Sequence, residues 1–248
     1  MMNIMGTRLD VVMTGDFELL SEVWQQINAE TERLHCMLNR FDAKSDISRI
    51  NRDAKNAPVE LNDELLGILT ELKKYHQHTF GYFDVSLRDF NLVIVDDDRK
   101  TVRFAQKDIS LDLGGYAKGY ALQRIQEILL QAGVTQALIN FGNSSILALG
   151  SHPHGQYWGI EIETRSEPKI YKLHNQSMSV SGNTAQHTEH IINPATGKYT
   201  SERKIVTVVS NNPVEAEVLS TALMVTDEKS FFLLKKMYCD TIIDIFYG

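Results

Sequence analysis

The segment Ser110-Leu-Asp-Leu-Gly-Gly-Tyr-Ala-Lys-Gly-Tyr-Ala121 joins three local patterns within twelve residues. Its apolar start predicts a strand that ends at Leu113, and the pair Gly114-Gly115 predicts a turn. Apolar residues then recur at helical spacing over residues 117–132, and Gly133 is typical of the residue that follows a helix. The sequence therefore predicts a strand, a tight turn and an amphipathic helix.

This junction has the features of an anion-binding site. Backbone N–H groups and the helix dipole attract anions at a helix N-terminus, and Gly114 and Gly115 allow a ligand to approach the main chain. Lys118 could reach a phosphate from the first helical turn, and Asp112 could accept a hydrogen bond from a ligand. The alternative is an ordinary strand–turn–helix unit with a surface lysine, because the segment matches neither a Walker loop nor a Rossmann fingerprint.

Outward from this junction, apolar periodicity predicts further helices, and runs rich in β-branched residues predict strands. The predicted helices are 17–38, one that begins behind Asn62, 213–225 and 228–237. The predicted strands are 7–14, a hairpin of 92–95 with 101–104, then 136–141, 144–149, 157–163, 168–173, 177–181, 204–210 and 240–246. Helices without strict βα alternation predict an α+β fold with a largely antiparallel sheet. Because no repeat or linker is visible, we expect one domain over residues 1–248.

Composition excludes several classes of protein. The 248 residues include 43% hydrophobic and 23% charged residues, as in ordinary globular proteins, and no apolar run approaches the ~18 residues of a membrane span. The net charge of −7 argues against a general nucleic-acid binder, which needs lysine and arginine to neutralise phosphates. One phosphorylated small molecule at a local site remains compatible with this charge.

Three further features of the sequence carry expectations. Cys36 and Cys239 lie in apolar stretches, so we expect buried free thiols. Residues 1–5 show neither a basic nor an apolar signal region, so no secretory signal is expected and the localisation stays open. The acidic run Asp96-Asp97-Asp98 is expected in a solvated hairpin turn rather than at a metal.

A second candidate site combines His190-Ile-Ile-Asn-Pro-Ala-Thr-Gly197 with the preceding loop-like Ser177-Met-Ser-Val-Ser-Gly182. A histidine between two turns could bind a phosphate or act as an acid or base near neutral pH. The alternative is a hydrogen-bonded structural histidine. We expect His76-Gln-His78 and His152-Pro-His154 to be surface features.

A third candidate site lies on the predicted helix 213–225. Glu217 and Thr221 are four residues apart and share one helix face. A carboxylate and a hydroxyl are hard oxygen ligands that suit Mg²⁺. The alternative is a solvated glutamate beside a packed threonine.

Taken in this order, these segments resemble the FAD:protein FMN transferases, the ApbE-like flavin transferase family. The motifs that carry the resemblance are Met5-Gly-Thr7, Ser45-Asp-Ile-Ser-Arg-Ile-Asn51, Gly81-Tyr-Phe-Asp-Val-Ser86, the segment Asp112–Ala121, Asn140-Phe-Gly142, Ser181-Gly182, the segment His190–Gly197 and Ala216-Glu-Val-Leu-Ser-Thr221. The similarity covers nearly the whole chain.

The resemblance implies a tunnelling-fold-like α+β architecture and Mg²⁺-dependent cleavage of FAD, with transfer of FMN to a Thr or Ser hydroxyl of a partner flavoprotein. It implies neither a nucleic-acid partner nor a transmembrane segment. The implied FAD contacts are Met5, Ser45, Asn51, Asp112, Gly114, Gly115, Lys118, Ser181, Gly182 and Thr196. It further implies a metal held by the Gly115 carbonyl, Glu217 and Thr221, and catalytic roles for His190 and Lys118.

This chain departs from the family pattern at four positions. Glu217, Asn193 and Gln123 stand where the family has aspartate, and Asn143 stands where it has a second glycine. Altered carboxylates near a proposed cation site support an alternative function, a flavin-binding paralogue that is non-catalytic or hydrolyses FAD weakly. Family members are commonly exported or lipid-anchored, but the acceptor protein and the compartment stay open.

Overall fold

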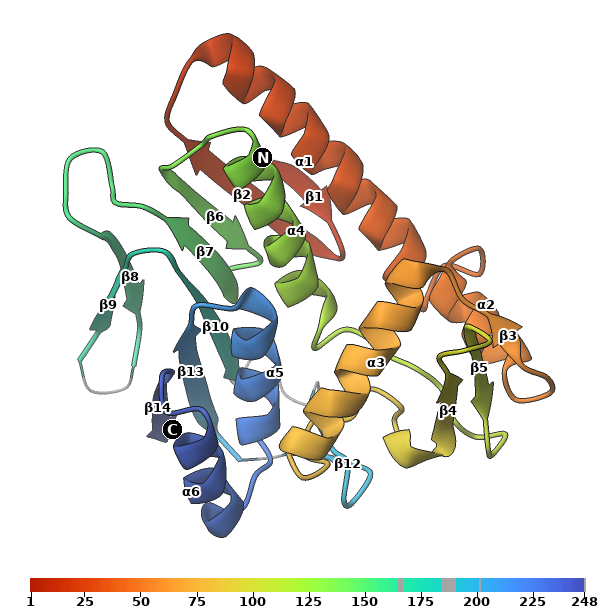
Figure 1. Ribbon diagram of the computed structural model, residues 1–248. Coiled ribbons are helices and arrows are strands. Elements are labelled where there is room, and N and C mark those ends of the chain that lie inside the picture. Colours follow the sequence, from red (N-terminus) through yellow and green to blue (C-terminus); the bar gives the residue numbers. More distant parts are fainter. Residues whose placement is uncertain (165–166, 184–190, 201, 248) are drawn as a thin grey trace.

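The largest element of the fold is an antiparallel sheet whose strands come from both the beginning and the end of the chain (Figure 1). The computed structural model describes residues 1–164, 167–183, 191–200 and 202–247. Within these residues, seven strands lie in the order β1-β2-β6-β7-β10-β13-β14, and each neighbouring pair is antiparallel. The strands are β1 (Met2–Ile4), β2 (Thr7–Met13), β6 (Ala137–Phe141), β7 (Ser145–Leu149), β10 (Gln176–Gly182), β13 (Lys204–Ser210) and β14 (Ile242–Tyr247). The predicted α+β class with a largely antiparallel sheet is confirmed.

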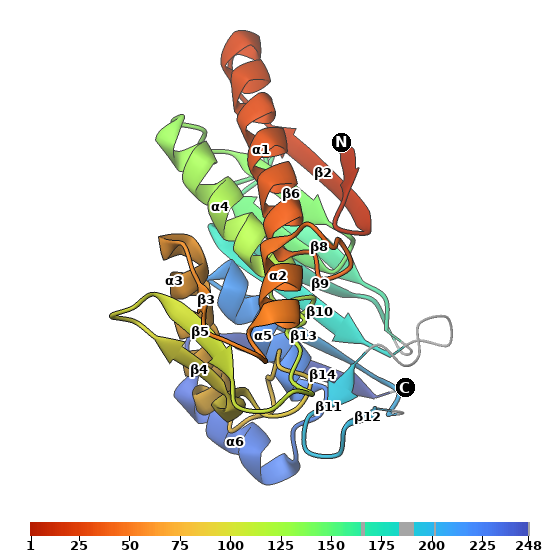
Figure 2. The same ribbon diagram turned by 90° about the vertical axis from the view of Figure 1, so that its right-hand side faces the viewer.

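Helices cover one face of this sheet. Figures 1 and 2 show α1 (Phe17–Leu38), α4 (Ala117–Gln131) and α5 (Pro213–Leu223) packed side by side across it, with α6 (Glu228–Met237) beside β14. The main core lies between these helices and the sheet and is built from the apolar stripes that predicted them. None of the described helices is both long and apolar enough to cross a membrane.

The opposite face of the sheet is covered by a two-stranded ribbon of β8 (Trp158–Ile162) and β9 (Lys169–Leu173). Strand β7 is buried on both faces, because its side chains alternate between two cores. Leu147 belongs to the main core, whereas Ile146 packs with Trp158 and Tyr171 of the ribbon. An uninterrupted apolar run such as β7 is what a strand covered on both faces requires.

A smaller unit lies beside the main sheet and carries one wall of the candidate site (Figure 2). Its helices are α2 (Asp46–Asp53), α3 (Asp63–His78) and the short 3-10 helix η1 (Phe90–Leu92). Its sheet has the order β3-β5-β4, with β3 (Val59–Glu60), β4 (Val93–Asp96) and β5 (Thr101–Phe104). Asn62 caps α3 by accepting a hydrogen bond from the Leu65 N–H, as its residue type predicted.

Several expectations from the sequence are wrong. Cys36 and Cys239 are exposed rather than buried, because each falls outside the apolar stripe of its segment. His76 is buried, not a surface residue. Residues 110–113 form no strand and follow the chain at 85–86, where the Asp112 N–H donates to the Val85 carbonyl at 2.7 Å. The predicted elements omitted β1, α2, β3, η1 and the hairpin of β11 (Ile192–Asn193) with β12 (Lys198–Tyr199).

Helix α4 crosses α5 at a position where only glycine fits. A β-carbon added to Gly119 would lie 2.8 Å from Cβ of Glu217 and 2.8 Å from the carbonyl oxygen of Pro213. Real β-carbons do not approach other atoms this closely, and the helix backbone at Pro213 cannot yield as a flexible side chain would. The absent side chain therefore sets the distance between the two helices.

Replacement of Gly119 with alanine is expected to lower the free energy of unfolding by about 1–3 kcal/mol, since overpacking forces α4 and α5 apart. Gly67→Ala in α3 is the matched control, because a β-carbon there meets nothing within 4 Å. Alanine is the better helix former, so this control should be up to about 1 kcal/mol more stable than the parent. Urea unfolding measures both changes; equal or greater stability of Gly119→Ala would contradict the close crossing.

Candidate active site

A cavity of about 680 Å³ opens where the start of α4 meets α5, the end of β10 and the loop that follows α3. Its size is ordinary for a small-molecule site. Eight of the residues singled out in the sequence line it, although they come from three separate segments. These are Asp112, Gly114, Gly115, Lys118, Ser181, Gly182, Glu217 and Thr221. The fold therefore brings most of the predicted site together.

A smaller hollow of about 270 Å³ adjoins this cavity and includes Met5. The two hollows share Gly114, Lys118, Gly142 and Ser144. Met5 lies in the two-residue turn between β1 and β2 with φ of +51°, so the tight hairpin holds a bulky side chain in a left-handed backbone position. Gly142 approaches the same hairpin so closely that a β-carbon would lie 2.7 Å from Thr7 Oγ1.

The start of α4 is fixed by Tyr116, which is fully buried and donates its hydroxyl hydrogen to Glu71 of α3. Among the residues that the structure describes, no side chain caps this helix start. Instead, the Gly114 N–H donates to Asp112 Oδ1 at 3.0 Å, and Asp112 Oδ2 pairs with Arg40 Nε at 3.1 Å. The turn is thus ordered by Asp112, while the helix dipole still faces the cavity.

Glu217 is the central charge of the cavity. Its side chain is only 5% exposed, and its Oε2 accepts hydrogen bonds from the hydroxyls of Ser145 at 2.6 Å and Ser179 at 2.8 Å. Its Oε1 forms an ion pair with Lys118 Nζ. A buried carboxylate needs such partners, because burial of an unpaired charge is costly. The alternative of a solvated glutamate is therefore wrong.

Gly115 and Thr221 face each other across the same cavity. A β-carbon on Gly115 would lie 3.4 Å from the Thr221 hydroxyl oxygen, so the backbone of the turn lies against the α5 face that carries Glu217 and Thr221. A carboxylate, a hydroxyl and a main-chain carbonyl are hard oxygen donors. The three positions singled out for a metal are therefore neighbours.

Other predicted residues lie outside the cavity lining. Ser45 is buried and caps α2, where it accepts a hydrogen bond from the Ser48 N–H at 3.0 Å. The Asn51 side chain bonds to both the N–H and the carbonyl of Leu111. Thr196 is exposed in the turn between β11 and β12. Their contact with FAD stays a prediction, and His190 lies outside the described residues.

Ser145 and Ser179, which hydrogen-bond to Glu217, were not predicted from the sequence. Ser177, Ser179 and Ser181 alternate along β10, so a period of two places them on one face of the strand. Ser179 and Ser181 each hydrogen-bond to Ser220 on α5 at 2.9 Å. The run of serines was therefore a readable signal for a polar face beside α5.

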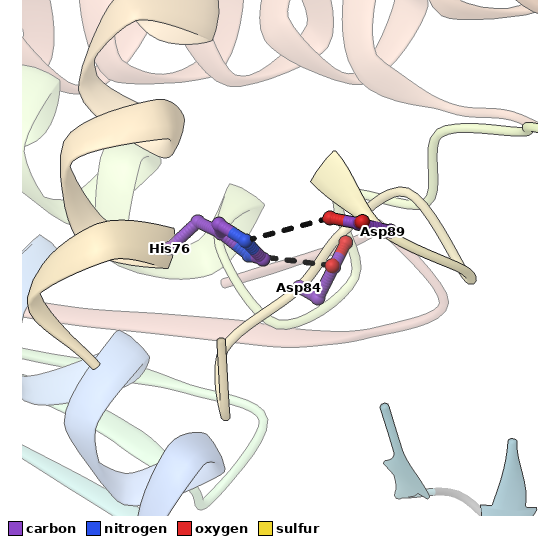
Figure 3. Close-up of side chains that lie close together, drawn as sticks. All are labelled: His76, Asp84 and Asp89. Atoms are coloured by element: carbon purple, nitrogen blue, oxygen red, sulfur yellow. Dashed lines mark ion pairs between the residues drawn. The ribbon is translucent and has the colours of Figure 1, made fainter. Parts of the chain in front are cut away.

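His76, Asp84 and Asp89 form a charged cluster beside the cavity, and Asp84 also lines the cavity (Figure 3). His76 lies in the last turn of α3, with its Nδ1 3.3 Å from Asp84 Oδ2 and its Nε2 3.8 Å from Asp89 Oδ1. Asp84 also accepts hydrogen bonds from the N–H groups of Ser86 and Phe90. A metal ion would take one ring nitrogen, whereas each nitrogen here faces a different carboxylate. The geometry favours a histidine cation between two carboxylates.

This cluster connects the loop after α3 to the helix, because Asp84 belongs to the loop and His76 belongs to α3. Asp84 also lines the cavity, so the cluster holds part of the cavity wall in place. Burial by itself lowers the pKa of His76, but contact with Asp84 outweighs it and leaves that pKa raised from 6.5. Burial likewise favours a higher pKa for Asp84, yet His76 and the Ser86 and Phe90 donors hold it below 3.8.

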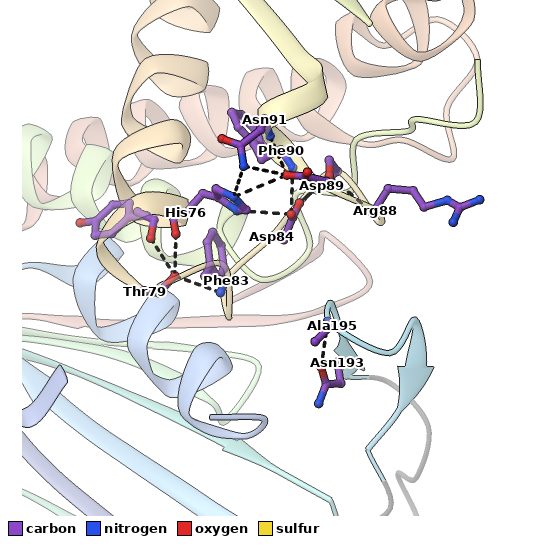
Figure 4. A network of polar contacts seen from close by, with 12 residues as sticks. His76, Thr79, Phe83, Asp84, Arg88, Asp89, Phe90, Asn91, Asn193 and Ala195 are labelled. Carbon is purple, nitrogen blue, oxygen red and sulfur yellow. Dashed lines mark hydrogen bonds and ion pairs between the residues drawn. The ribbon is translucent and has the colours of Figure 1, made fainter. Parts of the chain in front are cut away.

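Figure 4 shows Asn193 apart from the His76 network, at the end of β11 where the turn to β12 begins. Its side-chain oxygen accepts a hydrogen bond from the Ala195 N–H at 3.0 Å. An aspartate could accept the same bond, so the turn itself tolerates this departure from the family pattern.

The fold and the cavity together define an α+β protein with a lysine, a buried carboxylate and a helix start converging on one small-molecule site. The model of the ApbE family matches residues 5–93 and 86–243. The chain belongs to the ApbE family, which confirms the resemblance, and the predicted class of transferase enzyme is confirmed by the relatives below.

Named relatives and solved structures agree with this family. The FAD:protein FMN transferase of Chlamydia muridarum is 26% identical over 273 residues, covering 93% of this chain and 85% of that protein. That of Salmonella typhimurium is 22% identical over 267 residues, covering 89% and 76%. The flavin transferase ApbE from Vibrio cholerae superposes with a TM-score of 0.86 at 20% identity, covering 98% of this chain and 90% of that one. The ApbE protein of Thermotoga maritima gives 0.83 at 20% identity, covering 99% and 94%.

The His76 pairs give the protein a pH-dependent contribution to stability. Because folding raises the pKa of His76, this contribution is complete below 6.5 and is lost as pH rises through the folded pKa. The melting-temperature difference between the parent and His76→Gln should therefore shrink between about pH 6 and about pH 9. His78→Gln, an exposed histidine of the same helix, is the control. A difference that stays constant or grows with pH would contradict a charged His76.

Proposed function

We propose that this protein transfers FMN from FAD to a Thr or Ser hydroxyl of a partner flavoprotein in a Mg²⁺-dependent reaction. The observation that carries this proposal is the convergence of Lys118, the Gly114-Gly115 turn and Glu217 on one cavity. A pyrophosphate needs positive charge and backbone donors, and a cation at the phosphates needs a carboxylate. The names of the relatives, FAD:protein FMN transferase, support the substrate and the type of transfer.

The residues of the cavity suit a divalent cation. Glu217 Oε1 already pairs with the ammonium group of Lys118, and both residues line the cavity, which supports a cation at this oxygen. Thr221 and the main chain of Gly115 lie beside it. Glu217, Thr221 and the Gly115 carbonyl are therefore the proposed ligands, and a bound Mg²⁺ would neutralise charge on the phosphates.

In the proposed reaction, the acceptor hydroxyl oxygen attacks the phosphorus of the FMN half. The bond from that phosphorus to the bridging oxygen breaks, AMP leaves, and the hydroxyl loses its proton. Phosphoryl transfer depends mainly on positioning and on electrostatic stabilisation, rather than on covalent chemistry by the protein. Lys118 and the N–H groups at the start of α4 would bind and orient the pyrophosphate. His190 is proposed to assist at the phosphates.

The second candidate function is a flavin-binding paralogue that is inactive or hydrolyses FAD weakly. The observation that favours it is the buried environment of Glu217, whose oxygens already have three partners within the chain. The two functions differ in their products. The transferase labels an acceptor protein, the hydrolase releases FMN and AMP, and the binding protein does neither.

The test incubates the protein with FAD, Mg²⁺ and an acceptor domain that carries a flavinylation threonine, followed by in-gel flavin fluorescence. We expect labelling that requires Mg²⁺ and the acceptor threonine. Glu217→Gln should slow labelling by roughly 100-fold or more, because even outer partners of metal ligands are worth 10–100-fold. Glu215→Gln on the same helix, which lies outside the cavity lining, should match the parent. FAD binding without labelling would exclude the transferase.

A further inference from the structure

Glu217 presents one oxygen to the cavity because the other is fully engaged. Its Oε2 accepts from Ser145 on β7 and from Ser179 on β10, both at hydrogen-bond distance. Ser179 is linked in turn to Ser220, whose hydroxyl donates to the Glu217 carbonyl at 3.0 Å. Two strands and the helix itself thus fix the carboxylate, and Oε1 is left for a cation.

Lys118 occupies this remaining oxygen. Its ammonium pairs with Oε1, and its side chain is 22% exposed while that of Glu217 is 5% exposed. The pair is therefore formed in a largely dry position, where attraction between opposite charges and repulsion between like charges are both stronger than in water. A second cation at the same oxygen would be repelled by the ammonium.

We propose that Lys118 and a divalent cation exchange on Glu217 Oε1, so that arrival of the cation releases Lys118 to the pyrophosphate. This inference rests on the proposed function, since it concerns the same cavity. Lysine suits the exchange because its charge sits at the end of a flexible four-carbon chain. The other proposed ligands, Thr221 and the Gly115 carbonyl, are uncharged, so Lys118 competes with the cation at Glu217 alone.

The serines and Lys118 therefore have different tasks. Ser145 and Ser179 are positioning residues that act through Glu217, whereas Lys118 is a counter-ion that also lines the cavity. Lys118 also follows directly on Ala117 in the first turn of α4, at a helix start that no described side chain caps. An ammonium released from Glu217 thus stays close to the backbone donors proposed to bind the same phosphates.

The test measures Mn²⁺ affinity without flavin, from the electron paramagnetic resonance signal of free Mn²⁺, at about pH 8, where carboxylates are ionised. Lys118→Met keeps an unbranched side chain, shorter by one atom, and removes its charge. This variant should bind Mn²⁺ about tenfold more tightly than the parent, because the cation no longer displaces a charge-assisted hydrogen bond. The same variant should bind FAD about tenfold more weakly when Mn²⁺ is present, because only then is Lys118 of the parent released to the pyrophosphate.

Four further variants serve as controls. Lys118→Arg retains the positive charge and should keep the parent's Mn²⁺ affinity, and Lys118→Gln replaces Lys118→Met if that variant does not fold. Lys169→Met removes the lysine of the Lys169–Asp244 pair on the ribbon side of the sheet and should change neither affinity. Glu217→Gln should abolish Mn²⁺ binding.

Unchanged or weaker Mn²⁺ binding by Lys118→Met would overturn the exchange. So would Mn²⁺ binding that survives Glu217→Gln, because the cation would then lie elsewhere. Neither result touches the proposed function by itself, since acceptor labelling with FAD is measured separately. If the parent neither binds FAD nor labels the acceptor, the proposed function itself is refuted.

Discussion

The close crossing of α4 and α5 at Gly119 is the constraint on which the candidate site depends. It places the first turn of α4 against the middle of α5, and so it brings Lys118 to Glu217, although 99 residues of sequence separate them. The same crossing lays the turn at Gly115 against Thr221. A side chain at position 119 would separate these groups before any chemistry at the site began.

The lining of the cavity bears on how an acidic protein would hold the proposed pyrophosphate ligand. Its net charge of −7 gives no attractive surface for a polyanion, and both Asp84 and Asp112 contribute to the lining. Each of these carboxylates is already paired, Asp84 with His76 and Asp112 with Arg40. Glu217, the third lining carboxylate, is paired with Lys118. Local pairing thus neutralises the acidic lining, and the helix start remains as the anion-attracting feature, to which Lys118 is added in the proposed exchange.

The sequence predicted those parts of the molecule that depend on local patterns. The spans of α1, α6 and β13 agree with the predicted ranges. Apolar periodicity and capping residues mark the two helices, and a run of β-branched residues marks the strand. Helix α2 was missed because its eight residues, Asp46–Asp53, are mostly polar and give only a short apolar signal. At the site, the motifs identified Lys118 and Glu217, but not Ser145, Arg40 or the buried His76. Those contacts join distant segments, and no local pattern specifies them.

The most direct test of this account is an anomalous-scattering map from crystals that contain FAD and Mn²⁺. The account predicts a Mn²⁺ peak within ligand distance of Glu217 Oε1, about 2.0–2.4 Å, with the Lys118 ammonium moved onto the pyrophosphate. A Mn²⁺ peak between His76 and Asp89 would contradict it. So would a bound FAD whose pyrophosphate lies away from the start of α4 while Lys118 remains paired with Glu217.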